Sequence, residues 1–213
     1  MDTRRLIPVL ALAVLAGCTS AVTSTLPGTT FTPTPTSAPP SSPAPLATVH
    51  DPGQVTGTIT GPCHVRGVPP DVLPDPRCTP GSVDPAVDQE HIHATICMTG
   101  WTAEVRPPEA QTEAFKFNVA YPAYGIPAGT ATELDHLVPL ELGGSNSASN
   151  LWPEAPPTPN PKDKVEDTLN HAVCSGKVTL AAAQDAIAQN WMTAEQVLGL
   201  AVTGGSMAGR DAR

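Results

Sequence analysis

Aromatic side chains are scarce in this sequence, which has 3 Phe, 3 Trp and 2 Tyr among its 213 residues. A hydrophobic core must therefore consist mainly of aliphatic side chains. The sequence also lacks a Gly-X-Y period, a long heptad repeat and any long apolar run beyond residues 6–16. These absences exclude a collagen, a coiled coil and a membrane protein with several spans.

Basic side chains are also few, with 11 Lys and Arg against 20 Asp and Glu and a net charge of −9. This balance excludes a protein that coats nucleic acid through a broad basic face. It is compatible with an enzyme that contacts a few phosphates through a metal ion and two or three cations. Residues 106–177 contain five Lys or Arg and nine Asp or Glu. Any nucleic-acid binding should therefore be weak, salt-sensitive and mostly non-specific.

The N-terminus has the pattern of an export signal. Arg4 and Arg5 precede an apolar run, residues 6–16, that is too short to span a membrane comfortably as a helix. The sequence Leu-Ala-Gly-Cys that ends at Cys18 resembles the lipobox of bacterial lipoproteins, in which the Cys is lipidated and becomes the new N-terminus. We therefore interpret residues 1–18 as a lipoprotein signal peptide that leads to a membrane-anchored protein on the extracellular side. An ordinary secretory signal is the alternative.

A change of composition separates this signal from the rest of the chain. Of the 31 residues from 19 to 49, 21 are Pro, Ser or Thr. Such a stretch buries too little apolar surface to offset the entropy of ordering it. We expect residues 19–49 to form a disordered linker, residues 50–202 to form one globular domain, and residues 203–213 to form a disordered tail. We expect the protein to be a monomer.

The cysteines support export. If Cys18 is lipidated, four remain, and an even number in an exported chain suggests two disulfides. The four are Cys63, Cys78, Cys97 and Cys174. Three pairings are possible, and we favour a local bridge between the first two and a long-range bridge between the last two. The alternative is a structural zinc site in which cysteines combine with histidines, although the chain has no CxxC pair. The candidate histidines are His64, His91 and His93.

Breaker-free stretches predict helices on both sides of the central region. Residues 109–117 follow two prolines and should form a short helix that packs Phe115 inward. Residues 180–191 have apolar side chains at positions i, i+3, i+7 and i+11, with Thr179 as the N-cap. We expect Thr193 to cap a further helix.

An Asp-His pair interrupts a leucine-rich segment in the second half of the chain. Burial of Asp135 and His136 costs free energy unless a partner compensates them. We expect a strand here, then a turn at Gly143-Gly144, a second strand from Asn150 and a helix over residues 162–174. The pair is either a metal ligand beside a general base or a locally satisfied ion pair at a strand end.

This order of strand, loop, strand and helix, with Asp-His in the first strand and Asn in the second, resembles the HNH nucleases of the ββα-metal superfamily. It is similar in particular to a group of small exported bacterial HNH-like proteins. The resemblance covers roughly residues 73–192. The segments that carry it are ELDHLVPLELGG, NLWPE, NPKDKVEDTL and VCSG, preceded by CTPGSV and TICMTGWTAEVRPP. The implied fold is α+β, with a ββα-metal core motif over residues 131–175, flanking loops, C-terminal helices and disulfide support.

The resemblance also implies roles for individual residues. His136 matches the general base that activates water, and Asp135 matches the acidic metal ligand before it. Asn150 matches the central Asn that holds the loop so that His136 points correctly. Asn160 matches the third position of the motif and would be a second metal ligand. Asp163 is the reserve candidate, because prolines flank Asn160 on both sides.

The chemistry that these residues imply is metal-assisted hydrolysis. Oxygen ligands suit one Mg²⁺ or Mn²⁺ ion better than Zn²⁺. Such an ion stabilises charge that develops on a scissile phosphate, while a histidine takes the proton from the attacking water. The candidate phosphate-binding cations are Lys162, Lys164 and Arg106.

The sequence thus predicts an exported, lipid-anchored HNH-type endonuclease that hydrolyses phosphodiester bonds in nucleic acid. DNA is the preferred substrate, and RNA is the open alternative. No separate sequence-reading module is visible, which favours a largely non-specific enzyme. The alternative function is a non-catalytic cell-envelope binding module on the same scaffold. The acidic composition, with few cations that could bind phosphate, favours this alternative.

Overall fold

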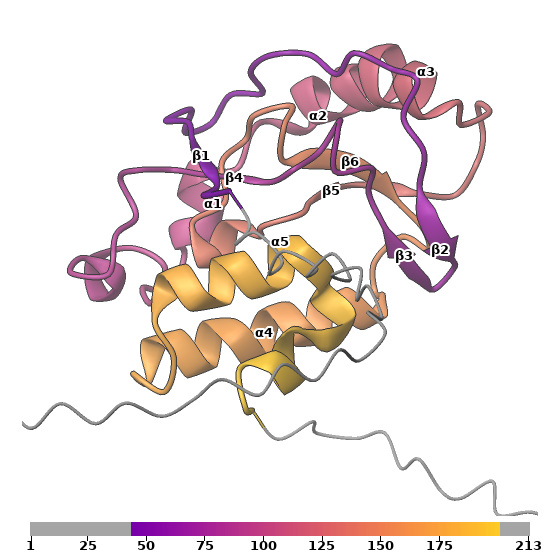
Figure 1. Cartoon of the computed structure of the whole chain (residues 1–213). Coiled ribbons are helices and arrows are strands. Elements are labelled where there is room, and N and C mark those ends of the chain that lie inside the picture. Colours follow the sequence, from indigo (N-terminus) through magenta and orange to yellow (C-terminus); the bar gives the residue numbers. More distant parts are fainter. Residues whose placement is uncertain (1–43, 201–213) are drawn as a thin grey trace, which may run out of the picture. The chain divides into compact units, whose positions relative to one another are not determined.

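The computed structural model describes residues 44–200, which form a mixed α+β unit (Figure 1). The predicted signal peptide with Cys18, most of the predicted linker and the predicted tail lie outside the described residues. Within residues 44–200, no helix is both long enough and apolar enough to cross a membrane.

The strands of the described residues are short and pair two by two. The parallel pair is β1 (Ala47–Thr48) with β4 (Ser82–Val83). The antiparallel pairs are β2 (Arg66–Val68) with β3 (Asp71–Leu73), and β5 (Glu133–His136) with β6 (Leu151–Glu154). Because β1 falls in the region predicted as linker, the folded unit begins before residue 50.

The helices are α1 (Trp101–Val105), α2 (Glu109–Phe115), α3 (Tyr121–Tyr124), α4 (Pro161–Cys174) and α5 (Leu180–Val197). Short 3-10 turns lie at Ile92–Ala94 and Leu140–Leu142. A π-helical turn, Lys116–Ala120, continues α2 into α3. The helix predicted over residues 109–117 therefore extends further along the chain, and its Phe115 is buried as predicted.

Helix α4 begins where the sequence supplies a complete N-terminal cap. Asn160 Oδ1 accepts the backbone N–H of Lys162 at 2.8 Å, and Asp163 accepts the backbone N–H of Asn160 at 2.9 Å. Pro161 occupies the first helical position, where its fixed φ fits the helix. The helix ends shortly before Gly176, whose φ of 72° favours glycine.

Helix α5 is capped as predicted at its start but differs from the prediction further on. Thr179 Oγ1 accepts the backbone N–H of Ala182 at 3.3 Å. Asn190 has a non-helical φ of −165° and ψ of 99°, and its side chain accepts the N–H of Met192 at 3.0 Å. The prediction that Thr193 caps the second segment is therefore wrong. A short polar Asn side chain competes for backbone N–H groups and interrupts the helix three residues earlier.

Two clusters of buried apolar side chains stabilise the unit. One joins α4 to α5, which lie side by side in Figure 1, and includes Leu169, Ile187 and Trp191. The other joins the β5–β6 hairpin to α2 and includes Phe115 and Trp152. The β5–β6 hairpin therefore has apolar support from α2, while α4 rests on α5.

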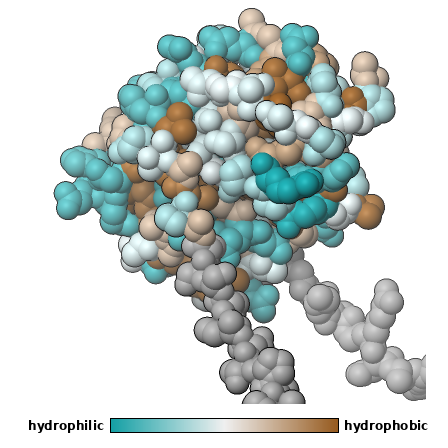
Figure 2. Space-filling view, turned by 45° about the horizontal axis from the view of Figure 1, so that its top comes forward, coloured by the Kyte–Doolittle hydropathy of each residue, from teal (hydrophilic) through white to brown (hydrophobic). Residues whose placement is uncertain are grey.

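Exposed hydrophobic residues are dispersed on the surface. On the face in Figure 2, small hydrophobic areas alternate with hydrophilic ones and do not merge into one broad patch. The large apolar side chains with most exposure include Val68 and Val197, which come from separate elements. This face therefore has no large apolar surface of the kind that marks a permanent protein interface.

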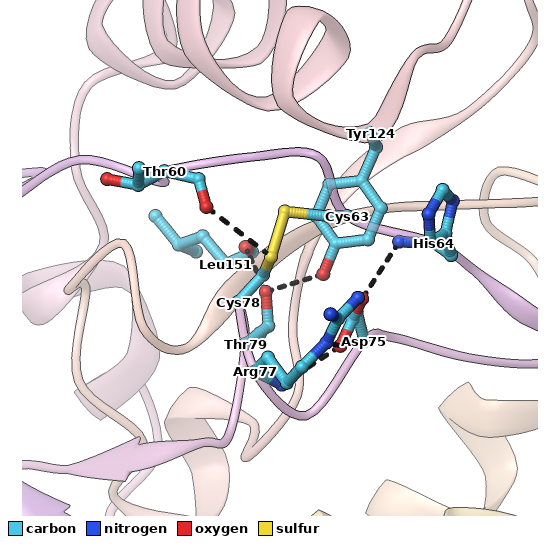
Figure 3. The surroundings of a disulfide bond; sticks show 9 residues. All are labelled: Thr60, Cys63, His64, Asp75, Arg77, Cys78, Thr79, Tyr124 and Leu151. Carbon is cyan, nitrogen blue, oxygen red and sulfur yellow. Dashed lines mark hydrogen bonds and ion pairs between the residues drawn. A yellow bond between two sulfur atoms is a disulfide. The ribbon is translucent and has the colours of Figure 1, made fainter.

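Both favoured disulfides are present. The Cα atoms of Cys63 and Cys78 are 6.1 Å apart, and those of Cys97 and Cys174 are 5.7 Å apart. Figure 3 shows the first bridge beside Tyr124, whose hydroxyl lies 2.8 Å from Thr79 Oγ1. Burial raises the pKa of Tyr124 to about 12, so the phenol stays neutral. The first bridge is therefore local, whereas the second joins the segment before α1 to the end of α4.

The two bridges should contribute unequally to stability. The Cys97–Cys174 bridge closes 77 residues and the Cys63–Cys78 bridge closes 15. In the chain-entropy model these loops correspond to about 4.5 and about 3 kcal/mol. We expect the C97A/C174A double variant to lose more free energy of unfolding than the C63A/C78A variant in urea titrations. Equal or reversed losses would contradict the entropic account.

Candidate functional site

The β5–β6 hairpin gathers acidic side chains on one face. Residues two apart in a strand share a face, and residues directly opposite on the paired strand share it too. Glu133 and Asp135 of β5 therefore lie on one face, together with Glu154 of β6, which is the partner of Glu133 in the register. The first turn of α4 contacts this face, since Lys162 bonds to Asp135.

Lys162 is a buried cation, with 1% of its side chain exposed. Its Nζ donates to Asp135 Oδ2 at 2.7 Å, to the backbone oxygen of His136 at 2.9 Å and to Glu166 Oε1. All three N–H groups of the ammonium are therefore used within the protein. The prediction that Lys162 binds phosphate does not fit this arrangement, because no donor is left for a ligand.

The charges around this ammonium depend on one another. Burial alone would lower the pKa of Lys162, but the neighbouring acidic groups, Asp135 first, raise it. Burial alone would raise the pKa of Asp135, but the charge and the hydrogen bond of Lys162, together with Glu154, lower it. Burial and the charge of Asp135 raise the pKa of Glu154 to about 10, so Glu154 is neutral at pH 7. The Oε2 atom of Glu154 is buried and has no partner among the described residues.

Asn150 closes the loop between the two strands. Its Oδ1 accepts the backbone N–H of Val138 at 2.9 Å, and its Nδ2 donates to the backbone oxygens of Val138 and Ser145, each at 2.9 Å. The loop is so tight that a Cβ at Gly144 would lie 1.8 Å from the oxygen of Val138. Only glycine fits there. Asn150 thus holds the backbone of the loop that follows His136.

His136 is the last residue of β5 and is 5% exposed. Its Nε2 lies 2.9 Å from Asn146 Oδ1 in a buried hydrogen bond. Burial lowers the pKa of His136 to about 4, so the imidazole is neutral at pH 7 and keeps a lone pair. A positioned neutral imidazole of this kind can accept a proton from a water molecule.

A cavity of about 230 Å³ lies beside His136. Arg106, in the segment after α1, lines this cavity and is exposed. Within residues 44–200, no carboxylate forms an ion pair with Arg106. Lys164 is exposed on α4 and does not line the cavity. Of the three cations predicted to bind phosphate, Arg106 is therefore the one available beside His136.

Asn160 has a structural role that the prediction of a metal ligand did not include. Its Oδ1 caps α4, and its Nδ2 donates to Glu133 Oε1 at 2.7 Å. Asp163, the reserve candidate, accepts hydrogen bonds from Thr158 at 2.7 Å and from the backbone of Asn160. Asn160 therefore connects the helix cap to Glu133 on the acidic face, while Asp163 completes the cap.

Oxygen donors nevertheless gather at the cavity. Carboxylates of Glu133, Asp135, Asp163 and Glu166 line it, and such hard donors suit Mg²⁺ or Mn²⁺. Across residues 44–200, no three His, Cys, Asp or Glu side chains are arranged closely enough to ligate one metal ion together. The donor chemistry therefore fits a divalent ion that keeps most of its water ligands, as Mg²⁺ commonly does.

A zinc site of the kind considered above is contradicted by the disulfides. All four cysteines of the folded unit are paired, which leaves no thiolate ligand. His91 is exposed and lies 2.8 Å from Asp88 in a local contact. His64 and His93 are exposed as well.

Sequence reasoning missed several residues of the site. Asn146 lies in a Ser/Asn-rich loop whose composition is typical of a solvated turn, yet it is 2% exposed and bonded to His136. Glu133 carried a usable signal, because it is two positions before Asp135 on a predicted strand. Glu154 and the burial of Lys162 had no such signal, since neither residue type is usually buried.

Loss of the buried ammonium should be costly. In a Lys162→Met variant, Asp135 and Glu166 would keep their buried positions without the cation, a change that typically costs about 3–5 kcal/mol. We expect urea unfolding to show a loss of this size, and Lys164→Met, an exposed control on the same helix, to stay near wild type. A loss below about 1 kcal/mol for Lys162→Met would show that the ammonium contributes little.

The buried histidine should also make stability depend on pH. The unfolded chain takes up a proton on His136 near pH 6.5, whereas the folded protein does so near pH 4. The contribution of His136 to the free energy of unfolding should therefore fall by roughly 3 kcal/mol as the pH drops from about 6.5 to about 4. Glu133 and Glu141, whose pKa values burial raises to about 7, act in the opposite direction, so the test is the difference between wild type and His136→Gln, which urea titrations should show to change by about this amount across the range. Parallel curves would contradict the burial of a neutral His136.

The site thus combines a neutral histidine, an exposed arginine and several carboxylates around one cavity. Comparison with protein-family models, with curated proteins and with solved structures gave no match.

Proposed function

We propose that this protein is a metal-dependent endonuclease of the ββα-metal type that hydrolyses phosphodiester bonds in DNA, with His136 as the general base. The observation that carries the proposal is the pairing of a buried, neutral His136 with the exposed Arg106 at one cavity. A general base and a phosphate-binding cation at one small polar cavity are two of the groups that hydrolysis of an anionic ester uses.

The order of elements supports the same reading. Strand β5, a loop, strand β6 and helix α4 follow one another, with Asp135 and His136 on the first strand and Asn150 just before the second. This is the order that the resemblance to HNH nucleases implies. The hydrogen bonds of Asn150 to both ends of the loop support for it the role that the resemblance implies for the central Asn.

In this proposal Asp135 and Glu133 would hold the divalent ion from one face of β5. When bound, the ion supplies Lewis-acid stabilisation of the charge that develops on the phosphate. His136 takes the proton of the attacking water, and Arg106 holds a phosphate oxygen. General-base assistance of this kind typically accelerates hydrolysis about 10²–10⁴-fold.

The charges around the cavity favour weak and non-specific binding. The cavity is lined by one cation and four carboxylates, so substrate affinity must come from the divalent ion and from Arg106 rather than from a basic groove. Few phosphate contacts give weak binding and little positional information. The enzyme is therefore proposed to be degradative.

The proposed location is outside the cell. The two disulfides are consistent with an extracytoplasmic domain, because such bridges persist in oxidising compartments. Lipidation of Cys18 would anchor the chain to the cell membrane.

One observation favours the alternative of a non-catalytic envelope-binding module. Lys162 already neutralises Asp135 with a buried ammonium, as a metal ion would. If this ion pair persists in the presence of Mg²⁺ or Mn²⁺, Asp135 needs no metal ion to neutralise it. The protein would then bind its partner through the same cavity without cleaving it.

A nicking assay separates the two functions. Purified protein with both disulfides intact should nick supercoiled plasmid with Mg²⁺ or Mn²⁺ and should not do so with EDTA. His136→Ala should lower the rate about 10²–10⁴-fold, while His171→Ala, an exposed histidine of α4, should leave it unchanged. A wild-type protein that leaves both plasmid and RNA intact with either metal would refute the enzyme and favour the binding module.

A further inference from the structure

We propose that Asn146 is the residue that fixes the tautomer of His136, so that Nε2 carries the hydrogen and Nδ1 is the atom that accepts the proton from water. The proposal that Nδ1 acts in catalysis rests on the proposed function. The hydrogen bonding of the pair does not, and it can be measured separately.

The orientation of the Asn146 amide is determined by its other contacts. Its Nδ2 donates to the backbone oxygens of Asp51 at 3.0 Å and of Val105 at 2.9 Å. The opposite orientation would turn Oδ1 toward two carbonyl oxygens and Nδ2 toward His136, which loses both hydrogen bonds inside a buried region. Oδ1 must therefore be the atom that faces His136.

The orientation of the amide determines which imidazole nitrogen is protonated. Oδ1 only accepts hydrogen bonds, so Nε2 of His136, at 2.9 Å, must be the donor. In a neutral imidazole the other nitrogen, Nδ1, then carries the lone pair. Nδ1 forms no hydrogen bond with a residue in the range 44–200. Because His136 lines the cavity, the proposal places the attacking water against Nδ1 there.

Asn146 is itself held from a distant part of the chain. Its backbone N–H donates to Asp51 Oδ1 at 2.7 Å, and Asp51 Oδ2 accepts from Thr56 at 2.7 Å. Asp51 is 95 residues earlier in the sequence. The segment at the start of the folded unit thus stabilises the position of the amide that orients the histidine.

The same amide also aligns the second functional side chain. Val105, whose carbonyl accepts from Asn146, is the residue directly before Arg106. Asn146 therefore connects the backbone that carries the exposed cation to the imidazole that acts as the base. Loss of this side chain should therefore disturb His136 directly and the backbone of Arg106 indirectly, while it leaves the proposed ion ligands Glu133 and Asp135, which do not contact it.

The test measures the tautomer and the activity independently. The ¹⁵N chemical shifts of the His136 ring, read through long-range proton correlations at neutral pH, report which nitrogen carries the hydrogen. We expect Nε2–H in the wild-type protein and a mixture of tautomers in Asn146→Leu. Asn146→Asp, which keeps an oxygen at the position, should retain Nε2–H better than Asn146→Leu. In the nicking assay we expect kcat of Asn146→Leu to fall about 10–100-fold, as for other residues that orient a site histidine, with a smaller change in KM.

The matched control is Asn170→Leu. Asn170 also donates through Nδ2 to two backbone oxygens, of Ile96 at 3.2 Å and Glu141 at 2.7 Å, but it does not contact His136. Asn170→Leu should show the same His136 tautomer and the same kcat as the wild-type protein, under conditions in which both are fully folded.

The outcomes distinguish this inference from the proposed function. Nδ1–H in the wild-type spectrum, or an unchanged tautomer in a folded Asn146→Leu, would overturn the role of Asn146 even if the protein nicks DNA. A wild-type protein that shows Nε2–H and loses it in Asn146→Leu, but cleaves no nucleic acid, would support the positioning of His136 by Asn146 and refute the nuclease.

Discussion

The buried ammonium of Lys162 is the interaction on which the rest of the site depends. An unpaired charge inside a protein is too costly to persist, so the ammonium requires Asp135 and Glu166 near it. Because the ammonium bonds to both carboxylates, it holds the first turn of α4 against β5. Its third hydrogen bond, to the backbone oxygen of His136, holds the strand end from which the imidazole projects. The position of the histidine is therefore a consequence of how one lysine is neutralised.

Much of this framework could be predicted from the sequence, because it depends on local chemistry. The glycine pair at 143–144, Thr179 at the start of α5 and the apolar spacing of α4 and α5 each specify their element within a few residues. The pairing of the cysteines was among three possibilities, and the structure has the favoured one. Asn150 was assigned its loop-closing position through a resemblance rather than through physics.

The remainder depends on contacts between residues far apart in the sequence, which local patterns do not contain. Lys162 lies in the first turn of a helix, where a lysine usually faces solvent, and only the acidic face of β5 explains its burial. The sequence around Asn146 is typical of a solvent-exposed turn, and only the fold places Asp51 and Val105 within hydrogen-bond distance of its side chain. The break in α5 was predicted at Thr193 instead of Asn190, because the apolar spacing of α5 continues through Asn190 to Trp191. Asn160 was predicted as a metal ligand, because its hydrogen bonds to Lys162 and Glu133 depend on how α4 packs against β5.

The long-range disulfide has a consequence for the cell that makes this protein. Cys97 precedes the segment that carries Arg106, and Cys174 ends the helix that carries Lys162, so the bridge joins the two parts that meet at the cavity. In the reducing cytoplasm this bridge would not persist. If the protein cleaves nucleic acid, its working geometry would be completed only after export, and the chromosome of the producing cell would be spared by the redox state of its own compartment.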